Sequence, residues 1–300
     1  KYGRPLVLAM SADLSDSTNI SGFAKGYGGA EDKGVGEHEA EFVKDGILSQ
    51  VVNEAGGVES NILVVPTASM IPKEVAKNYK KALKKLGCKN INIYNVTKRK
   101  QCDKKSVQKL FIDANCVFFT GGNQSRIVDL VGNTPIHDIL FDKIKNDPNF
   151  VLAGTSAGAM SMSSEMIMGG SSVDCLLKGA VKMREGMGYI DNMIIDSHFI
   201  KRGRFGRLAE AVAKFPKLIG VGLGEDTGLV IKSNEFRVIG SGMVMVIDPS
   251  DLTHNNHEIL DEGMPMSMAN LTTHILADGD RFFMDKRTIE VFPLEVYKTQ

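Results

Sequence analysis

The sequence has no excess of charge of either sign. Lysine and arginine total 36 residues, aspartate and glutamate also total 36, and the formal net charge at pH 7 is therefore zero. Nucleic acids and anionic membrane surfaces attract proteins through an excess of positive charge. We therefore expect neither as the main partner, although a local basic patch is compatible with this composition.

Long apolar runs and paired cysteines are also lacking. No apolar stretch approaches the roughly 18–20 residues that a membrane-spanning helix needs, so we expect no membrane partner. The cysteines are scattered with no Cys-x-x-Cys pair, which predicts free thiols and neither a disulfide framework nor a zinc site. Because the chain begins at Lys1 and not at Met, we expect a trimmed N-terminus, and the sequence does not distinguish a cytoplasmic protein from an exported one. The four cysteines are Cys88, Cys102, Cys116 and Cys175.

The 300 residues have an ordinary globular composition, in which short apolar runs alternate with amphipathic stretches. One such stretch, 73–87, repeats Val75, Tyr79 and Leu83 at helical spacing and ends at Gly87, and 104–115, 135–147 and 206–215 have similar patterns. Apolar strands joined by helices predict a mainly parallel central sheet between two helical layers, a three-layer α/β sandwich. The strand-like runs are 5–10, 61–66, 90–96, 116–121, 149–154, 192–199 and 217–224.

The pattern changes after residue 228. Residues 228–233, 236–248 and 271–284 resemble strands with short turns and no helix between them, which predicts antiparallel strands near the C-terminus. We expect one domain over 1–300, with a parallel α/β core at 1–228 and an appended β-rich part at 229–300. Residues 12–40 are polar and glycine-rich, which predicts a long loop, and such loops are often functional.

In the stretch "VLAGTSAGAM" (151–160), an apolar run leads directly to Ser156, and small residues flank this serine on both sides. A strand followed by G-x-S-x-G and a helix is the layout of a nucleophile elbow, where strand and helix approach so closely that the neighbours of the serine must be small. The alternative is a glycine-rich turn in which Ser156 only caps a helix, and the five-residue pattern by itself does not decide between them.

A serine nucleophile needs a base, and among the six histidines His198 is the strongest candidate. It lies at the C-terminal end of the strand-like run 192–199, and the C-terminal ends of strands line the ligand crevice in open α/β sheets. A purely structural, hydrogen-bonded histidine is the alternative. His254 and His257 have His-x-x-His spacing, but their polar turn shows no third ligand, so we expect no metal.

Two further stretches are suited to substrate contacts. "FFTGGNQSRI" (118–127) ends an apolar run on two glycines, whose bare backbone can bring N–H groups against an oxyanion. "HFIKRGRFGRL" (198–208) places three arginines directly after the candidate base, where guanidinium groups could hold a carboxylate. A solvated basic turn that leads into a helix is the alternative for the second stretch.

Six blocks in this order resemble the cyanophycinases, which are serine peptidases related to aspartyl dipeptidase on a fold like that of the class I glutamine amidotransferases. The similarity runs from about residue 28 to 231 and more loosely to the C-terminus. Six ordered blocks are far more specific than the elbow pattern alone. The blocks are "GGAEDK" (28–33), "VVPTAS" (64–69), "FFTGGNQSRI" (118–127), "GTSAGAM" (154–160), "DSHFIKRGRFGRL" (196–208) and "GLGEDTGLVI" (222–231).

The resemblance implies that Ser156 is the nucleophile, that His198 is the general base, and that an acidic residue between them in the chain orients the histidine. Asp174 falls where the acid of the family would lie, and Glu165 and Glu185 flank it as alternatives. The fold, like that of flavodoxin, would be the three-layer sandwich already predicted.

The resemblance also implies an oxyanion hole made by the backbone N–H groups of Gly122 and Ala157. Glu225, Asp226 and Thr227 match a family block near the site, and we do not expect them to be catalytic. The expected substrate-binding residues, for the aspartyl carboxylates above all, are Gln124, Asp196, Ser197, Arg202, Arg204 and Arg207.

Three departures from the family pattern alter the expected pocket. The family commonly has D-Q-H where this chain has Asp196-Ser197-His198, and G-G-D-Q where it has Gly121-Gly122-Asn123-Gln124. The segment 11–33 is longer and more polar than in the family. None of these departures removes the serine machinery, but together they leave the identity of the substrate open.

These features predict a serine peptidase that hydrolyses aspartyl-linked peptides, with the β-Asp-Arg units of cyanophycin as one candidate substrate. Backbone donors suffice for the charge of the tetrahedral intermediate, so we expect neither a cofactor nor a metal. An α-aspartyl dipeptidase with the same triad and a non-catalytic protein that binds acidic peptides are the alternatives. The family resemblance implies a homodimer.

Overall fold

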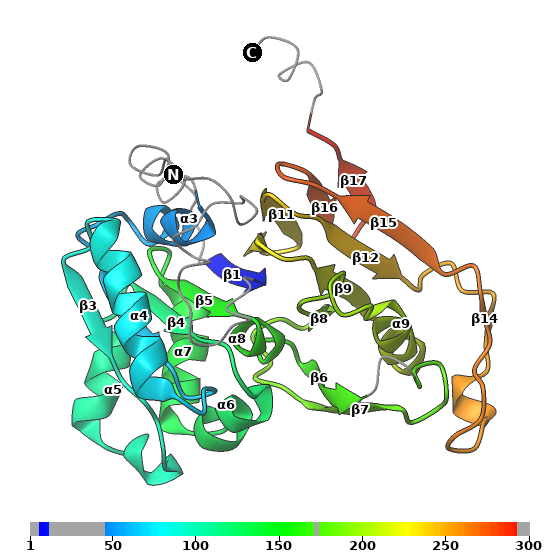
Figure 1. Cartoon of the computed structure of the whole chain (residues 1–300), viewed down its shortest axis with the longest axis horizontal. Coiled ribbons are helices and arrows are strands. Elements are labelled where there is room, and N and C mark those ends of the chain that lie inside the picture. Colours follow the sequence, from blue (N-terminus) through cyan, green and yellow to red (C-terminus); the bar gives the residue numbers. More distant parts are fainter. Residues whose placement is uncertain (1–5, 12–45, 171–173, 293–300) are drawn as a thin grey trace, which may run out of the picture.

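The structure is a computed structural model, which describes residues 6–11, 46–170 and 174–292. Its largest element is a nine-stranded sheet, of which five neighbouring strands run parallel in the order β1-β5-β4-β2-β3 (Figure 1). β4 and β5 are buried at every residue, because helices cover both faces of the sheet. These strands are β1 (Leu6–Ser11), β2 (Asn61–Val65), β3 (Asn90–Ile93), β4 (Cys116–Phe119) and β5 (Val151–Thr155).

Helices lie on both faces of this sheet, and alternate strand residues point into the two cores. Val117 and Phe119 of β4 pack in the core with α5 (Lys105–Ile112), α6 (Gln124–Val131) and α7 (Pro135–Asn146), the first of which follows the short helix η1 (Arg99–Gln101). Cys116 and Phe118 pack in the opposite core, with α3 (Ile47–Glu54) and α4 (Pro72–Lys85). The predicted three-layer α/β sandwich is confirmed.

The chain after residue 226 continues the same sheet with antiparallel strands. β10 (Thr227–Lys232) pairs with β1, and β11 (Glu235–Gly240), β16 (Arg281–Phe283) and β17 (Thr288–Glu290) follow it outwards. The antiparallel strands expected near the C-terminus are therefore present. They extend the parallel sheet outwards from its edge strand β1.

A second sheet holds two runs that the sequence analysis placed in the central sheet. β8 (Met193–Asp196) and β9 (Ile219–Leu223) pair in parallel with each other, and β12 (Val244–Asp248) and β15 (Thr272–Leu276) complete the order β15-β12-β9-β8. That placement was wrong. Met193 and Ile195 of β8 pack in the core shared with the central sheet, whereas Ile194 packs beneath α9 (Phe205–Lys214). A strand covered on both faces is apolar throughout in either sheet, so its composition did not distinguish the two.

Smaller elements complete the described part of the chain. β6 (Glu165–Gly170) and β7 (Val181–Glu185) form an antiparallel hairpin below α9, and β13 (His254–Asn255) pairs with β14 (Met268–Ala269) around the short helix η2 (His257–Ile259) (Figure 1). Within the described ranges, no helix combines the length and apolarity that crossing a membrane requires. The predicted loop at 12–40 and the block at 28–33 lie outside the described residues.

Close backbone packing joins β4 and β5 to α8 (Ala157–Met160), the short helix after Ser156. A Cβ atom on Gly158 would lie 2.2 Å from the carbonyl oxygen of Phe119, and one on Gly154 would lie 2.5 Å from the backbone of Gly158. Both distances are well below van der Waals contact, so the glycines allow the helix to approach the two strands.

Gly158→Ala is therefore expected to lower the free energy of unfolding by about 1–3 kcal/mol, the usual cost of overpacking a core. Thermal unfolding followed by circular dichroism measures this as a lowered Tm. Gly169→Ala is the matched control, because nothing lies within 4 Å of a Cβ at Gly169. Equal Tm values for the two variants would contradict the steric argument.

Candidate active site

Ser156 occupies the turn between β5 and α8. Its backbone has φ 50° and ψ −113°, a conformation that few non-glycine residues adopt, and its N–H donates to the carbonyl of Met10 at 2.8 Å. The structure has the strand–turn–helix geometry that the G-x-S-x-G pattern predicts. Strained backbone of this kind concentrates at functional sites, where the surrounding packing maintains it.

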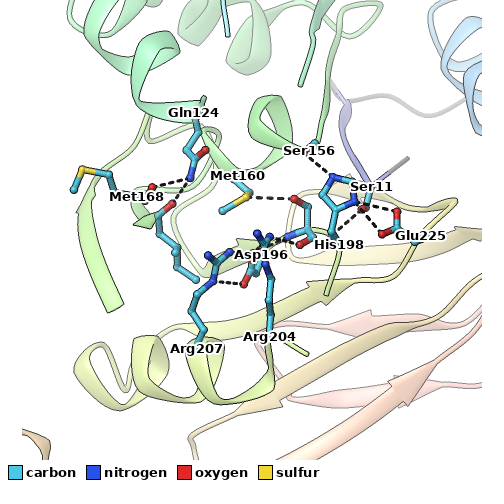
Figure 2. Close-up of polar contacts among 12 residues, drawn as sticks. Ser11, Gln124, Ser156, Met160, Met168, Asp196, His198, Arg204, Arg207 and Glu225 are labelled. Carbon is cyan, nitrogen blue, oxygen red and sulfur yellow. Dashed lines mark hydrogen bonds and ion pairs between the residues drawn. The ribbon is translucent and has the colours of Figure 1, made fainter. Parts of the chain in front are cut away.

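His198 faces Ser156 from the second sheet. It lies two residues beyond the end of β8, and its Nε2 is 3.0 Å from Oγ of Ser156 (Figure 2). The ring is almost completely buried, the backbone has φ 52°, and the backbone N–H donates to Oγ of Ser11 at 2.9 Å. The two residues expected to act as nucleophile and base are therefore within hydrogen-bond distance of each other.

The acid beside the imidazole is Glu225. Its two carboxylate oxygens lie 2.9 and 3.0 Å from Nδ1 of His198 (Figure 2). A carboxylate only accepts hydrogen bonds, so this contact places the proton of a neutral imidazole on Nδ1 and leaves Nε2 to accept the hydroxyl proton of Ser156. This is the order of contacts in a serine hydrolase triad.

The expectation that Asp174 fills this position was wrong. Nδ1 carries one proton, and the carboxylate of Glu225 already accepts it, whereas Asp174 is exposed beyond the end of β6. The two alternatives considered, Glu165 and Glu185, lie directly opposite each other in the β6–β7 hairpin. Burial raises the pKa of Glu165, and the neighbouring charge of Glu185 raises it further.

The positions of Glu225 and His198 along the chain carry a topological signal, which can be read only once the neighbouring strands are known. His198 follows the end of β8 by two residues, and Glu225 follows the end of β9 by two residues. Neighbouring parallel strands end at the same edge of a sheet, so residues at equal offsets beyond them meet. The signal was missed because it requires knowing that these two strands are neighbours and parallel.

The Gly121-Gly122 turn lies against the serine. A Cβ on Gly121 would be 3.3 Å from Cβ of Ser156, and Gly122, at φ 142°, passes so close to Ala68 that a Cβ there would lie 2.2 Å from its carbonyl oxygen. Ala157 is the first residue of α8, where a helix leaves its N–H group without an intrahelical acceptor. The two expected oxyanion donors therefore belong to the two backbone segments that flank Ser156.

Asp196 is fully buried and holds two arginines (Figure 2). Arg207 donates to both of its carboxylate oxygens, with Nε 2.8 Å from Oδ2, and Arg204 donates from Nη1 to Oδ1 at 3.1 Å. Burial lowers the pKa of the Arg204 guanidinium, and the charge of Asp196 opposes this effect. Asp196 and Arg207, both expected to bind substrate, instead satisfy each other inside the protein.

The other expected substrate residues differ in their freedom to bind a ligand. Gln124 donates from Nε2 to the carbonyl oxygens of Ile167 and Met168 at 2.7 and 3.2 Å. Ser197 is buried, with its hydroxyl 3.4 Å from the sulfur of Met160. Both side chains therefore make contacts within the protein. Arg202 is exposed in the turn between His198 and α9.

Two other histidines make contacts elsewhere in the described part of the chain. His137 lies in α7 with Nε2 2.7 Å from the carbonyl oxygen of Met187, and His254 pairs with Ser267 at 2.6 Å. Among the residues that the structure describes, no group of three or more His, Cys, Asp or Glu side chains is arranged to hold a metal ion.

Comparisons with known proteins identify the family of this chain. The model of peptidase family S51 matches residues 34–239. The chain belongs to peptidase family S51. This S51 peptidase is 35% identical over 263 residues to a cyanophycinase of Trichormus variabilis, with 87% of this chain and 85% of the relative covered. A cyanophycinase of Geminocystis herdmanii is 34% identical over 256 residues, with 85% and 91% covered.

A solved structure shows the same fold. A peptidase from an acI-B1 Actinobacterium superposes on this S51 peptidase with a TM-score of 0.57, covering 90% of this chain and 97% of the other at 21% identity. Family and relatives make this protein a serine peptidase, and the predicted cyanophycinase-like relationship is confirmed.

Glu225→Gln is expected to lower kcat by about 10³-fold or more, because an amide neither orients the imidazole correctly nor stabilises the imidazolium. Steady-state peptidase kinetics measure the change, and circular dichroism confirms that the variant is folded. Asp174→Asn is the matched control and should keep activity close to wild type. The reverse order of effects would restore Asp174 as the acid.

Asp196→Asn is expected to lower the free energy of unfolding by about 3 kcal/mol or more, because it leaves buried guanidinium charge without its counterion. Urea denaturation measures the difference. Glu290→Gln is the control, because its pair with Arg281 is solvent-exposed at 3.6 Å and such pairs contribute about 0–1 kcal/mol. Similar losses in the two variants would show that the buried pair adds no stability.

Proposed function

We propose that this serine peptidase hydrolyses aspartyl-linked peptides through an acyl-enzyme, with Ser156, His198 and Glu225 as its triad. The observation that carries the proposal is the continuous line of contacts from Oγ of Ser156 through the imidazole to the carboxylate of Glu225, at 3.0 and 2.9 Å. Hydrogen-bond distances of this kind are the geometric requirement for general-base activation of a hydroxyl.

In the first half-reaction, Oγ of Ser156 attacks the carbonyl carbon of the scissile amide while its proton moves to Nε2 of His198. The negative charge on the carbonyl oxygen is stabilised by the N–H groups of Gly122 and Ala157. The imidazolium, stabilised by Glu225, then donates its proton to the leaving amine, and the C–N bond breaks. Water, deprotonated by His198, then attacks the ester carbonyl, the C–O bond to Oγ breaks, the imidazolium returns its proton to Oγ of Ser156, and the acid leaves.

An excess of guanidinium groups beside the base supports an acidic substrate. Arg202, Arg204 and Arg207 lie within ten residues of His198, and one buried carboxylate, Asp196, accepts from two of them. Exposed Arg202, together with partly exposed Arg204, can then receive the aspartyl carboxylate, while Arg207 holds Asp196 in place. The curated relatives named cyanophycinase make β-Asp-Arg units the first substrate to test.

The first test is covalent labelling. An active-site-directed fluorophosphonate should label wild-type protein at Ser156, identified by mass spectrometry of the labelled peptide, and should leave Ser156→Ala unlabelled. Labelling depends on the activated nucleophile and needs no knowledge of the substrate. A folded wild-type protein that takes up no label would support the alternative, a non-catalytic protein that binds acidic peptides.

A panel of β-Asp-Arg, α-Asp-Arg, α-Asp-Leu and Ala-Arg dipeptides then separates the substrate classes. Mass spectrometry should show that the β-Asp-Arg dipeptide is cleaved fastest and that Ala-Arg, which lacks the aspartyl carboxylate, is not cleaved. Preferential cleavage of the α-linked dipeptides would identify an α-aspartyl dipeptidase with the same triad. Cleavage of Ala-Arg at the same rate would contradict the proposed role of the arginines.

A further inference from the structure

A cavity lies beside α9. It has a volume of about 240 Å³ and is bounded by β7, by α9 and by the segments around Gly179 and η2. Pockets for drug-sized ligands span about 300–1,000 Å³, so this one suits a smaller molecule of amino-acid size. None of the residues assigned above to the triad or the oxyanion hole lines it. Its lining residues are Lys178, Gly179, Val181, Met183, Glu210, Ala211, Lys214, His257 and Glu262.

Glu210 is the decisive residue of this cavity. It is 98% buried in the middle of α9, and its Oε1 accepts hydrogen bonds from the backbone N–H groups of Gly179 and Val181 at 3.0 and 3.1 Å. Two such donors stabilise the charged carboxylate. The second oxygen, Oε2, is buried and has no hydrogen-bond partner among the described residues. A buried carboxylate oxygen without a donor is costly, and a bound ligand would supply the donor that the described residues do not.

The other charged groups of the cavity have both signs. Lys178 and Lys214 line it with two positive charges, and Nζ of Lys178 is held by the carbonyl oxygen of Leu260 at 2.6 Å. Glu262 supplies a second carboxylate, which lies so close to the backbone of Gly179 that a Cβ there would be 1.5 Å from its Oε2. Two positive and two negative charges favour a ligand that also carries both signs.

His257 adds a polar group that carries no charge at neutral pH. Burial lowers its pKa below the ordinary value, and the neighbouring charges of Lys178 and Lys214 lower it further. A neutral imidazole can donate one hydrogen bond and accept another. His257 can thus contact a ligand without adding to the positive charge of the two lysines.

We propose that this cavity binds a small zwitterion of amino-acid size, whose ammonium or guanidinium group donates to Oε2 of Glu210 and whose carboxylate lies between Lys178 and Lys214. The site would be distinct from the peptidase centre, since Ser156 and His198 do not line it. The inference does not rest on the proposed substrate of the peptidase.

L-arginine is the first probe, because it combines a guanidinium group, an ammonium group and a carboxylate. Isothermal titration calorimetry of the full chain should show that arginine binds wild type, and that Glu210→Gln weakens this binding by about tenfold or more through the lost charge-assisted hydrogen bond. The glutamine can still accept from Gly179 and Val181, so the variant should fold. Glu258→Gln is the matched control, because this exposed carboxylate is a neighbour of the cavity that does not line it.

Agmatine, which has the two basic groups of arginine and no carboxylate, separates the two halves of the site. Wild type should bind arginine more tightly than agmatine, and Lys214→Ala should remove that preference. Lys214 is exposed, so its removal tests the site even if Glu210→Gln is unstable. Peptidase activity of both variants should remain close to wild type, which separates this site from the triad.

Three results would overturn the proposal. If arginine binds Glu210→Gln as tightly as it binds wild type, it does not bind in this cavity and occupies another site such as the peptidase centre. A cavity that holds only solvent would give no Glu210-dependent binding of either probe. If wild type and Lys214→Ala prefer arginine over agmatine equally, Lys214 does not bind the carboxylate of the ligand. If wild-type protein binds arginine as expected but has no peptidase activity, the proposed function is wrong and the proposed cavity site is not.

Discussion

The hydrogen bond between Ser156 and His198 joins two different sheets. Ser156 ends a strand of the central sheet, and His198 follows a strand of the second sheet, so the 3.0 Å contact exists only while the two sheets remain packed together. That packing is apolar: Ile195 and Val221 of the second sheet share one core with Leu229 of the central sheet. The geometry of the site is thus a consequence of hydrophobic burial between the sheets.

Two polar contacts strengthen this junction beside the reactive groups. The backbone N–H of His198 donates to Oγ of Ser11, and the backbone N–H of Ser156 donates to Met10, so the end of β1 holds both residues. Both residues also have positive φ, a conformation that costs free energy and persists only where the surroundings impose it. The site is preorganised by its backbone as well as by its side chains.

Buried charges are paired differently at the start and in the middle of α9. At its start, Asp196 and the arginines neutralise one another in an almost dry environment beside the proposed catalytic centre. Further along, Glu210 has two backbone donors on one oxygen and none on the other. The same physical rule, that a buried charge needs a partner, makes the first cluster structural and is the basis for the binding site proposed at the second.

Local patterns in the sequence determined the layer architecture, the turn at Ser156 and the pairing of a serine with His198. They did so because apolar periodicity, small flanking residues and strand-end positions are properties of short segments. Only the tertiary structure decided that 193–196 and 219–223 leave the central sheet, that Glu225 and not Asp174 meets the imidazole, and that Asp196 binds Arg207. The physical reason is that strand neighbours and buried ion pairs depend on which distant segments pack together, and this packing is settled by the burial of the whole chain.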